Sequence, residues 1–198
     1  AGVDVDHFIP AAEPPGHAPP NVGCVSRLVP RKVQHRLIAA AQRLRERGTE
    51  VVLLIIGKGR LEARLRRLAE RSGVSVRFEI DVPWSQLPNL YQSMDVFCMP
   101  CRSRWGGLEV EGLGLVFLEA AAAGLPVLAG SSGGSPETVI PGETGFVVHS
   151  VNDICDGLEL LLEDRDAAHQ IGAKGRCRVV EEYVWDRVVA RLDDGFRS

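Results

Sequence analysis

Residues 33–57 read VQHRLIAAAQRLRERGTEVVLLIIG, and this stretch decides the fold class. Leu37 and Leu44 stand two helical turns apart on one apolar face, which predicts an amphipathic helix over residues 33–47. The unbroken apolar run at residues 51–56 follows at once and ends at a glycine. Such a run is typical of a strand that is buried on both faces of a parallel sheet.

The same alternation of helix and strand continues along the chain. Short apolar runs predict strands at residues 22–25, 51–56, 74–80, 95–99, 126–129 and 146–148. Helical spacing predicts helices at residues 33–47, 60–71, 85–93, 115–123 and from Asp153 onward, with Pro88 interrupting the third. We therefore predict an α/β fold, a Rossmann-like parallel sheet with helices on both faces.

The first twenty residues differ in composition from the rest. Residues 1–20 are rich in Pro, Gly and Ala, which predicts an interdomain linker remnant rather than a folded element. Residues 21–198 are long enough for one sizeable core, and we predict that they form a single domain. We expect another domain to precede the linker.

The composition is that of an ordinary globular domain. A net charge of -3 argues against broad nucleic-acid binding. No apolar run approaches the roughly 20 residues that span a bilayer, and we expect no signal peptide at the acidic start.

Five cysteines, an odd number, indicate reduced thiols and a cytoplasmic protein. Cys98 and Cys101 form a CxxC, for which a redox pair or half of a zinc site is the alternative to two buried thiols; because no second ligand pair has suitable spacing, we expect no metal.

Cations gather directly after the first predicted strand. The segment reads SRLVPRK at residues 26–32, and it contains Arg27 and Lys32 beside a predicted helix start. An arginine fork and a lysine point charge suit the oxygens of a diphosphate. A solvated basic turn is the alternative reading of this segment.

Glycines and carboxylates gather after the fourth predicted strand. The segment EGLGLVFLE runs from Glu111 to Glu119, and Gly112 and Gly114 leave the backbone bare at a helix start. Free N–H groups and the helix dipole favour an anion there, and carboxylates accept hydrogen bonds from sugar hydroxyls. An ordinary acidic helix start is the alternative, but Glu119 stands among small apolar residues and needs a partner.

These segments together resemble a known family. SRLVPRK at 26–32, EGLGLVFLEA at 111–120 and GGSPETVIPGETG at 133–145 are similar to the C-terminal domain of family 4 glycosyltransferases, half of a GT-B fold. Glu111 and Glu119 fit the Glu-x7-Glu signature of that family. Within that family, the amino-acid sequence of these segments is most similar to the actinobacterial phosphatidylinositol-mannoside mannosyltransferases.

The resemblance implies a function and a site. It implies the donor-binding domain of a retaining hexosyltransferase that uses a nucleoside-diphosphate sugar, GDP-mannose by similarity alone, with UDP or ADP donors left open. Glu111 would face the transferred hexose as the catalytic residue, without a cofactor or metal. The donor-binding residues implied are Arg27, Lys32, Gly112, Leu113, Gly114, Leu115, Val116 and Glu119. A non-catalytic nucleotide-sugar-binding module is the alternative function.

The resemblance also implies partners. An N-terminal GT-B domain would carry the acceptor site, for a lipid-linked or small-molecule acceptor, and would place the enzyme peripherally at the inner membrane face. The isolated domain is then expected to be inactive. The chain departs from the family where relatives usually have glycine, at Val33 and Asp81, and has His35 in place of an aspartate.

Overall fold

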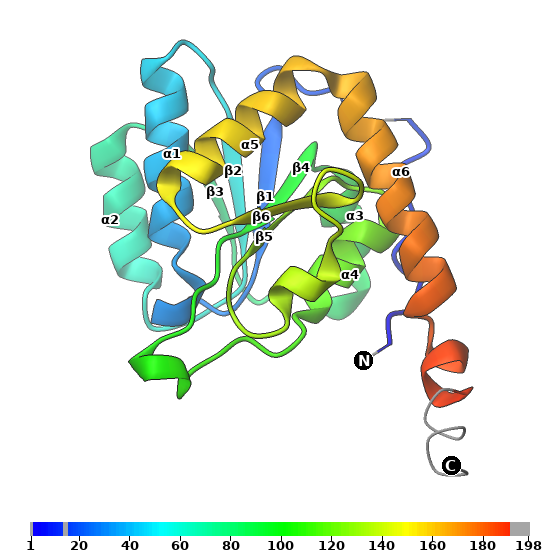
Figure 1. Cartoon of the computed structure of the whole chain (residues 1–198). Helices are drawn as coiled ribbons and strands as arrows, with labels where there is room; N and C mark the ends of the chain where they lie inside the picture. The colour runs from blue at the N-terminus through cyan, green and yellow to red at the C-terminus, as the bar shows by residue number, and fades with distance from the viewer. Residues whose placement is uncertain (1, 14–15, 191–198) are drawn as a thin grey trace.

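The computed structural model describes residues 2–13 and 16–190 of the chain. Its centre is one six-stranded sheet in the order β3-β2-β1-β4-β5-β6, and every neighbouring pair is parallel (Figure 1). The strands are β1 Asn21–Val25, β2 Val52–Ile56, β3 Ser75–Glu79, β4 Val96–Met99, β5 Val127–Gly130 and β6 Gly145–Val148. The sheet confirms the prediction of a parallel sheet, with β2 almost fully buried and the edge strand β3 half-buried or exposed.

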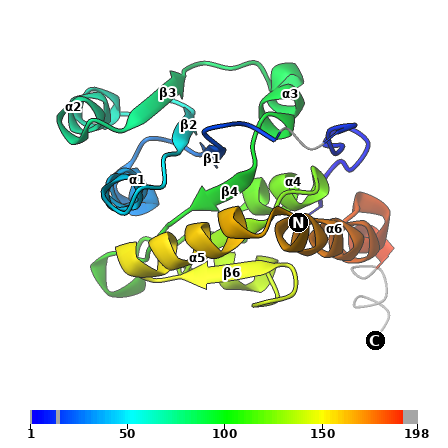
Figure 2. The same cartoon turned by 90° about the horizontal axis from the view of Figure 1, so that it is seen from above.

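Helices cover both faces of this sheet. They are α1 Gln34–Glu46, α2 Glu62–Ser72, α3 Leu87–Gln92, α4 Leu115–Ala122, α5 Val151–Glu163 and α6 Arg165–Glu182. Figure 2 shows α1, α2 and α5 on one side of the sheet and α3 and α4 on the other, with α6 beside α4. The Rossmann-like fold class is therefore confirmed, with each element within a few residues of its predicted bounds.

The strand order creates a crevice for the site. The chain lays β1, β2 and β3 outward in one direction and then returns to place β4 on the other side of β1. The loops after β1 and β4 consequently leave the sheet in opposite directions, and a crevice opens between them at the carboxyl edge. The predicted site segments at residues 26–32 and 111–119 both follow these two strands.

Val33 and Asp81 are two of the three described non-glycine residues with positive φ, the third being Trp105 with φ 54°. Val33 has φ 41° and ψ 39° at the cap of α1, and Asp81 has φ 55° after β3. Left-handed backbone costs a residue with a Cβ roughly 1–2 kcal/mol, and it is rare for a β-branched side chain. These are the two positions where the resembled family usually has glycine. The backbone therefore keeps the conformation that glycine would adopt, although the residues have changed.

The described part of residues 1–20 contains no helix or strand, but it packs against the domain. Phe8 is buried, and its ring meets that of Tyr91 edge-to-face with centroids 5.4 Å apart. The backbone N–H of Val3 donates to the carbonyl of Tyr183 over 2.8 Å. The predicted boundary at residue 20 stays a prediction, and the linker segment contributes to the core.

One element differs from its predicted form. Pro88 was expected to interrupt a helix over residues 85–93, but it lies in the first turn of α3, after a separate 3-10 turn at Trp84–Gln86. Proline is well tolerated there because the N–H that it lacks has no partner within the helix. Among residues 2–13 and 16–190, no helix combines the length and apolar character needed to cross a bilayer.

Two helical glycines give a test of the packing between α6 and the turn after α4. A Cβ added to Gly172 in α6 would overlap the backbone carbonyl of Gly124, whereas one added to Gly157 in α5 meets only the flexible side chain of Leu128 at 3.0 Å. We expect Gly172→Ala to lower the free energy of unfolding by about 1–3 kcal/mol through overpacking. Gly157→Ala should be neutral or raise it by up to about 1 kcal/mol, since alanine favours helix. Urea unfolding of both variants measures this, and equal destabilisation would contradict the close approach of α6.

Candidate functional site

A buried ion pair joins the two predicted site segments. Lys32 ends the 3-10 turn Pro30–Lys32 after β1, and its Nζ lies 2.6 Å from Oε2 of Glu111, which follows β4. Lys32 is only 6% exposed and Glu111 only 9%. Two charges are tolerated at such depth because each neutralises the other. The carboxyl edge thus brings together the lysine and the glutamate that the sequence placed in separate motifs.

Further charges extend this pair toward the surface. Nε of Arg31 lies 3.5 Å from the same Glu111 oxygen, and its Nη1 lies 3.6 Å from Glu109. Arg104 reaches Glu109 from the other side over 3.1 Å. The network holds three cations and two carboxylates, which leaves one positive charge for an incoming anion. Arg31 and Glu109 were not predicted as site residues, although both stand beside predicted ones in the sequence.

Glycines allow the loops after β4 and β5 to cross in contact. The backbone N–H of Gly134 donates to the carbonyl of Gly112 over 3.1 Å, and buried Ser132 accepts from the N–H of Glu111 over 2.9 Å. A side chain at Gly133, where φ is 54°, would overlap the carbonyl of Glu111. These contacts fix the segment that carries Glu111 at the carboxyl edge.

The first turn of α4 presents bare backbone beside the ion pair. Gly114 caps the helix with φ 77°, and a Cβ built on Gly112 meets nothing within 4 Å. The first N–H groups of a helix have no intrahelical partner and carry the positive end of its dipole. Leu113, Leu115 and Val116, the other predicted residues of this turn, are half-buried or exposed. The turn can therefore accept an anion next to Lys32.

Glu119 lies in the second turn of α4 and faces α3. Its Oε2 accepts a hydrogen bond from the buried hydroxyl of Tyr91 over 2.8 Å. Burial raises the pKa of Glu119, and the Tyr91 hydrogen bond partly opposes that shift. Tyr91 is the partner that the isolated carboxylate required, and no sequence motif indicated it because α3 and α4 meet only in the fold.

Arg27 stands apart from the ion pair. Its exposed side chain lines a groove of about 420 Å³ with Lys58 and Asp81, and it forms no hydrogen bond or ion pair within the described parts of the chain. Its carbonyl is held by Nε2 of buried Gln34 over 2.9 Å. The structure thus separates the two cations that were predicted to bind phosphate. Lys32 is buried and paired with Glu111, whereas Arg27 is exposed and unpaired among the described residues.

The two cysteines of the CxxC segment are buried near the end of β4. Cys98 and Cys101 are free, buried thiols, and burial raises the pKa of both. Cys101 Sγ lies 3.2 Å from Ser135 Oγ. Across residues 2–13 and 16–190, no group of three or more His, Cys, Asp or Glu side chains has the arrangement of a metal site.

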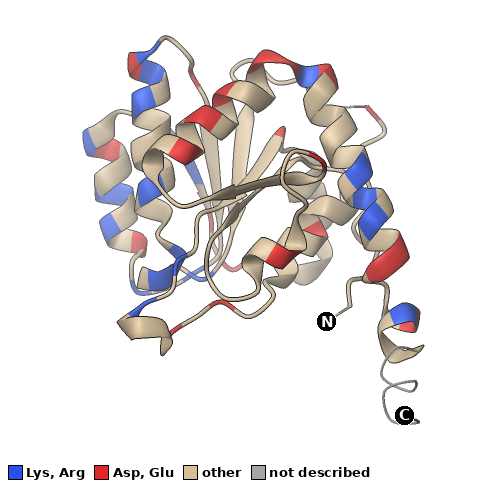
Figure 3. Ribbon diagram, viewed as in Figure 1, with Lys and Arg blue, Asp and Glu red and all other residues tan. Residues whose placement is uncertain are grey.

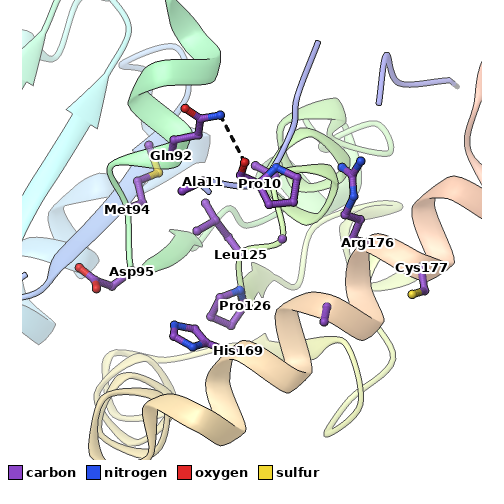
Figure 4. Close-up of a pocket in the computed structure, with 13 residues that line it drawn as sticks. Pro10, Ala11, Gln92, Met94, Asp95, Leu125, Pro126, His169, Arg176 and Cys177 are labelled. Atoms are coloured by element: carbon purple, nitrogen blue, oxygen red, sulfur yellow. Dashed lines mark hydrogen bonds between the residues drawn. The ribbon is translucent and has the colours of Figure 1, made fainter. Parts of the chain in front are cut away.

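A further pocket of about 350 Å³ lies away from the predicted residues (Figure 4). It is lined by Met94 and Asp95, which precede β4, and by Pro126, which precedes β5. Its surface is mainly apolar, and Arg176 beside it donates to the carbonyl of Phe8 over 3.1 Å. The pocket is therefore at the amino edge of the sheet, opposite the crevice.

The sheet order and the layering of the helices define the class of the protein. The fold is that of the GT-B glycosyltransferases. The profile of the glycosyl transferases group 1 family matches residues 7–178, and the chain belongs to this family.

The chain is similar to characterised relatives in sequence and to solved structures in fold. The chain is 45% identical to the GDP-mannose-dependent alpha-(1-6)-phosphatidylinositol monomannoside mannosyltransferase of Mycobacterium tuberculosis, over 100% of this chain and 54% of that protein. It superimposes on sucrose-phosphate synthase from Thermosynechococcus elongatus with a TM-score of 0.84 and 26% identity, over 100% of this chain and 51% of the other. The C-terminal domain of the Francisella tularensis group 1 protein LpcC gives a TM-score of 0.77 and 23% identity, over 93% and 100%. The chain spans about half the length of the curated relatives it matches.

The raised pKa of Glu119 predicts a pH-dependent stability. Because burial raises this pKa above its ordinary value of 4.5, ionisation at neutral pH costs the folded state more than the unfolded one. Glu119→Gln keeps an acceptor for Tyr91 and removes that cost. We expect the variant to melt at a higher temperature than wild type at pH 7, and the difference to vanish as the pH falls below 4.5. Melting curves across pH test this with exposed Glu143→Gln as control, and a difference independent of pH would refute the cause.

Proposed function

We propose that this chain is the donor-binding half of a retaining GT-B mannosyltransferase whose donor is GDP-mannose. The observation that carries the proposal is the buried Lys32–Glu111 pair beside the bare first turn of α4. It supplies a cation, an anion-binding helix start and a carboxylate within one crevice. The choice of GDP-mannose is supported by the relative at 45% identity, which is named for that donor.

The diphosphate of the donor would take the positive groups of the crevice. Lys32 Nζ contacts Oε2 of Glu111 and donates to Sδ of Met99 over 3.3 Å, and a phosphate oxygen would replace the thioether, which is a weak acceptor. Nε of Arg31 lies 3.5 Å from the same Glu111 oxygen, so Lys32 can turn toward a phosphate without leaving that carboxylate unpaired. We assign Arg27 to the same diphosphate from the open groove, together with the N–H groups of Gly112–Val116.

The two carboxylates would take the hydroxyls at either end of the donor. Glu111, beside Lys32, is assigned to the transferred hexose. Glu119 is assigned to the ribose, since Tyr91 occupies Oε2 and leaves Oε1 to accept from a diol. Glu119 lies inside α4, whereas Glu111 lies four residues before the helix begins, so the two carboxylates are assigned to different ends of the donor.

The chemistry then follows from electrostatics. Charge that builds on the leaving diphosphate is stabilised by Lys32, Arg27 and the start of α4, all in place before reaction. We propose front-face transfer with retention, in which the leaving phosphate helps to deprotonate the acceptor hydroxyl, without a metal or cofactor. The acceptor, a lipid-linked one by analogy with the relative's name, would sit on an N-terminal GT-B domain that also brings the enzyme to the inner face of the cytoplasmic membrane.

A non-catalytic nucleotide-sugar-binding module is the second candidate. Val33 and Asp81 favour it, because glycines that flank the site in the resembled family have been replaced. Both residues nevertheless keep a left-handed backbone, so the loops follow the path that glycine would allow, and this favours the enzyme. A transfer assay with the protein extended by its N-terminal half separates the two functions, since only the enzyme produces mannosylated acceptor.

Removing either phosphate cation tests the donor site. We expect Arg27→Ala and Lys32→Ala each to weaken GDP binding by about 1.5–3 kcal/mol, roughly 10- to 150-fold, the range of hydrogen bonds to charged groups. Isothermal titration with GDP and GDP-mannose measures it. Lys174→Ala, which removes an exposed cation of α6, is the control for the loss of a positive charge. Unchanged affinity in both variants would sink the assignment.

The 198-residue chain alone should bind donor and transfer nothing. Transfer requires an acceptor oxygen held about 3–3.5 Å from the reacting carbon in a site closed to water. Exposed Trp185 and Val189 after α6 provide an apolar strip for a missing half, and the continuation of that strip toward Phe196 lies outside the described residues. Incubation with GDP-mannose and a phosphatidylinositol mannoside checks this. Mannosylated product above background would show that the acceptor site is already complete.

A further inference from the structure

A second concave surface lies beside the crevice, between α1, α2 and the loop after β4. Its volume is about 470 Å³, and apolar side chains of α2, among them Leu65, form its floor. Figure 3 shows Lys and Arg along α2 and in the loop near it. The cationic residues that line it are Arg64, Arg67, Arg71, Arg102 and Arg104, with His35 among them, and we call this surface the arginine pocket.

The charges of the arginine pocket are largely unpaired. No carboxylate lines it, and Arg64, Arg67, Arg71 and Arg102 form no ion pair with any described residue. By contrast, Arg66 of the same helix is paired with Glu62 at 2.9 Å and lies outside the pocket. Burial, and then the charges of Arg36, Arg102 and Arg64, lower the pKa of His35. Cations that converge on one cavity without counter-charges favour an anionic ligand.

An apolar tip stands directly beside the pocket. The loop after β4 exposes 72% of Trp105 and 91% of Leu108, and it projects from the body of the domain (Figure 1). The Arg104 guanidinium lies 5.4 Å from the Trp105 ring centroid. Tryptophan and an aliphatic side chain beside arginines are the composition with which proteins enter the interfacial layer of a bilayer.

We propose that the arginine pocket and the Trp105–Leu108 tip form a docking site for an anionic phospholipid surface, with lipid phosphates in the pocket and the tip in the interface. A single-stranded nucleic acid would also meet arginine and tryptophan. The bilayer is favoured because Leu108 gains nothing from base stacking, whereas it gains from leaving water for the interface.

This docking site would place the crevice at the membrane. The backbone N–H of Arg102, in the pocket, donates to the carbonyl of Arg31, in the charge network of Glu111, over 2.9 Å. A domain held at the pocket therefore holds its crevice close to the lipid surface. The benefit for a lipid-linked acceptor rests on the proposed function, but the docking itself does not depend on it.

Vesicle flotation of the whole 198-residue chain tests the site. We expect binding to phosphatidylcholine vesicles in which phosphatidylinositol replaces about a third of the lipid, and little binding to pure phosphatidylcholine. Arg67→Gln/Arg71→Gln should weaken partitioning roughly 30-fold, at about fivefold per arginine near an anionic surface. The matched control is Lys174→Gln/Arg187→Gln, which removes the same charge from exposed positions in α6 and just after it.

The tip and the source of the phosphate are tested separately. Trp105→Ser/Leu108→Ser should reduce vesicle binding and leave its salt dependence unchanged, because no charge is altered. All variants should melt as wild type does and bind GDP as wild type does, so a failed donor assay would not be confused with a failed docking site. Equal binding to both kinds of vesicle overturns the proposal. So does an equal loss of vesicle binding in Arg67→Gln/Arg71→Gln and in the control Lys174→Gln/Arg187→Gln. So does a pocket that binds glycerophosphoinositol or a single-stranded oligonucleotide while the vesicles stay free.

Discussion

The buried contact between Lys32 and Glu111 is the interaction on which the site depends. The two residues follow different strands, and the pair at 2.6 Å is what joins the loop after β1 to the loop after β4. Breaking a buried ion pair from one side costs about 3–5 kcal/mol, because the remaining charge stays without water. An anion that enters the crevice therefore has to replace this contact, and Arg31 at 3.5 Å from Glu111 makes the exchange possible.

Close backbone approach is the second constraint, and it explains the glycines of the motifs. The loops after β4 and β5 touch through the hydrogen bond from Gly134 to Gly112, and a Cβ on Gly133 would overlap the carbonyl of Glu111. The same geometry persists where glycine is absent. Val33 retains a left-handed conformation although it has a Cβ, because its side chain is fully buried and the packing around it fixes the backbone. The site thus tolerates local strain that the packed sheet around it can hold.

The charge distribution divides the carboxyl edge into distinct environments. Around Lys32 and Glu111 cations outnumber carboxylates, and the excess continues outward into the arginine pocket. Around Glu119 a carboxylate stands almost alone in apolar surroundings with one tyrosine hydroxyl. A polar ligand that carries phosphates at one end and hydroxyls at the other matches this division. The field of a domain with a net charge of -3 is therefore locally positive where an anion would arrive.

Periodicity and turn chemistry by themselves determined the parallel sheet, the covering helices and the edge at which the motifs meet. They succeeded because strands such as β2 are buried on both faces and read as apolar runs, and because loops at the carboxyl ends of parallel strands must share one edge. Only the tertiary structure decided which charges touch. Arg31 between two carboxylates, Tyr91 under Glu119, the isolation of Arg27 and the convergence of α2 arginines on Arg102 all join residues far apart in the chain, and no local pattern encodes such distances. Burial of Phe8 was hidden for the same reason, since a proline-rich segment carries no periodic signal of what it packs against.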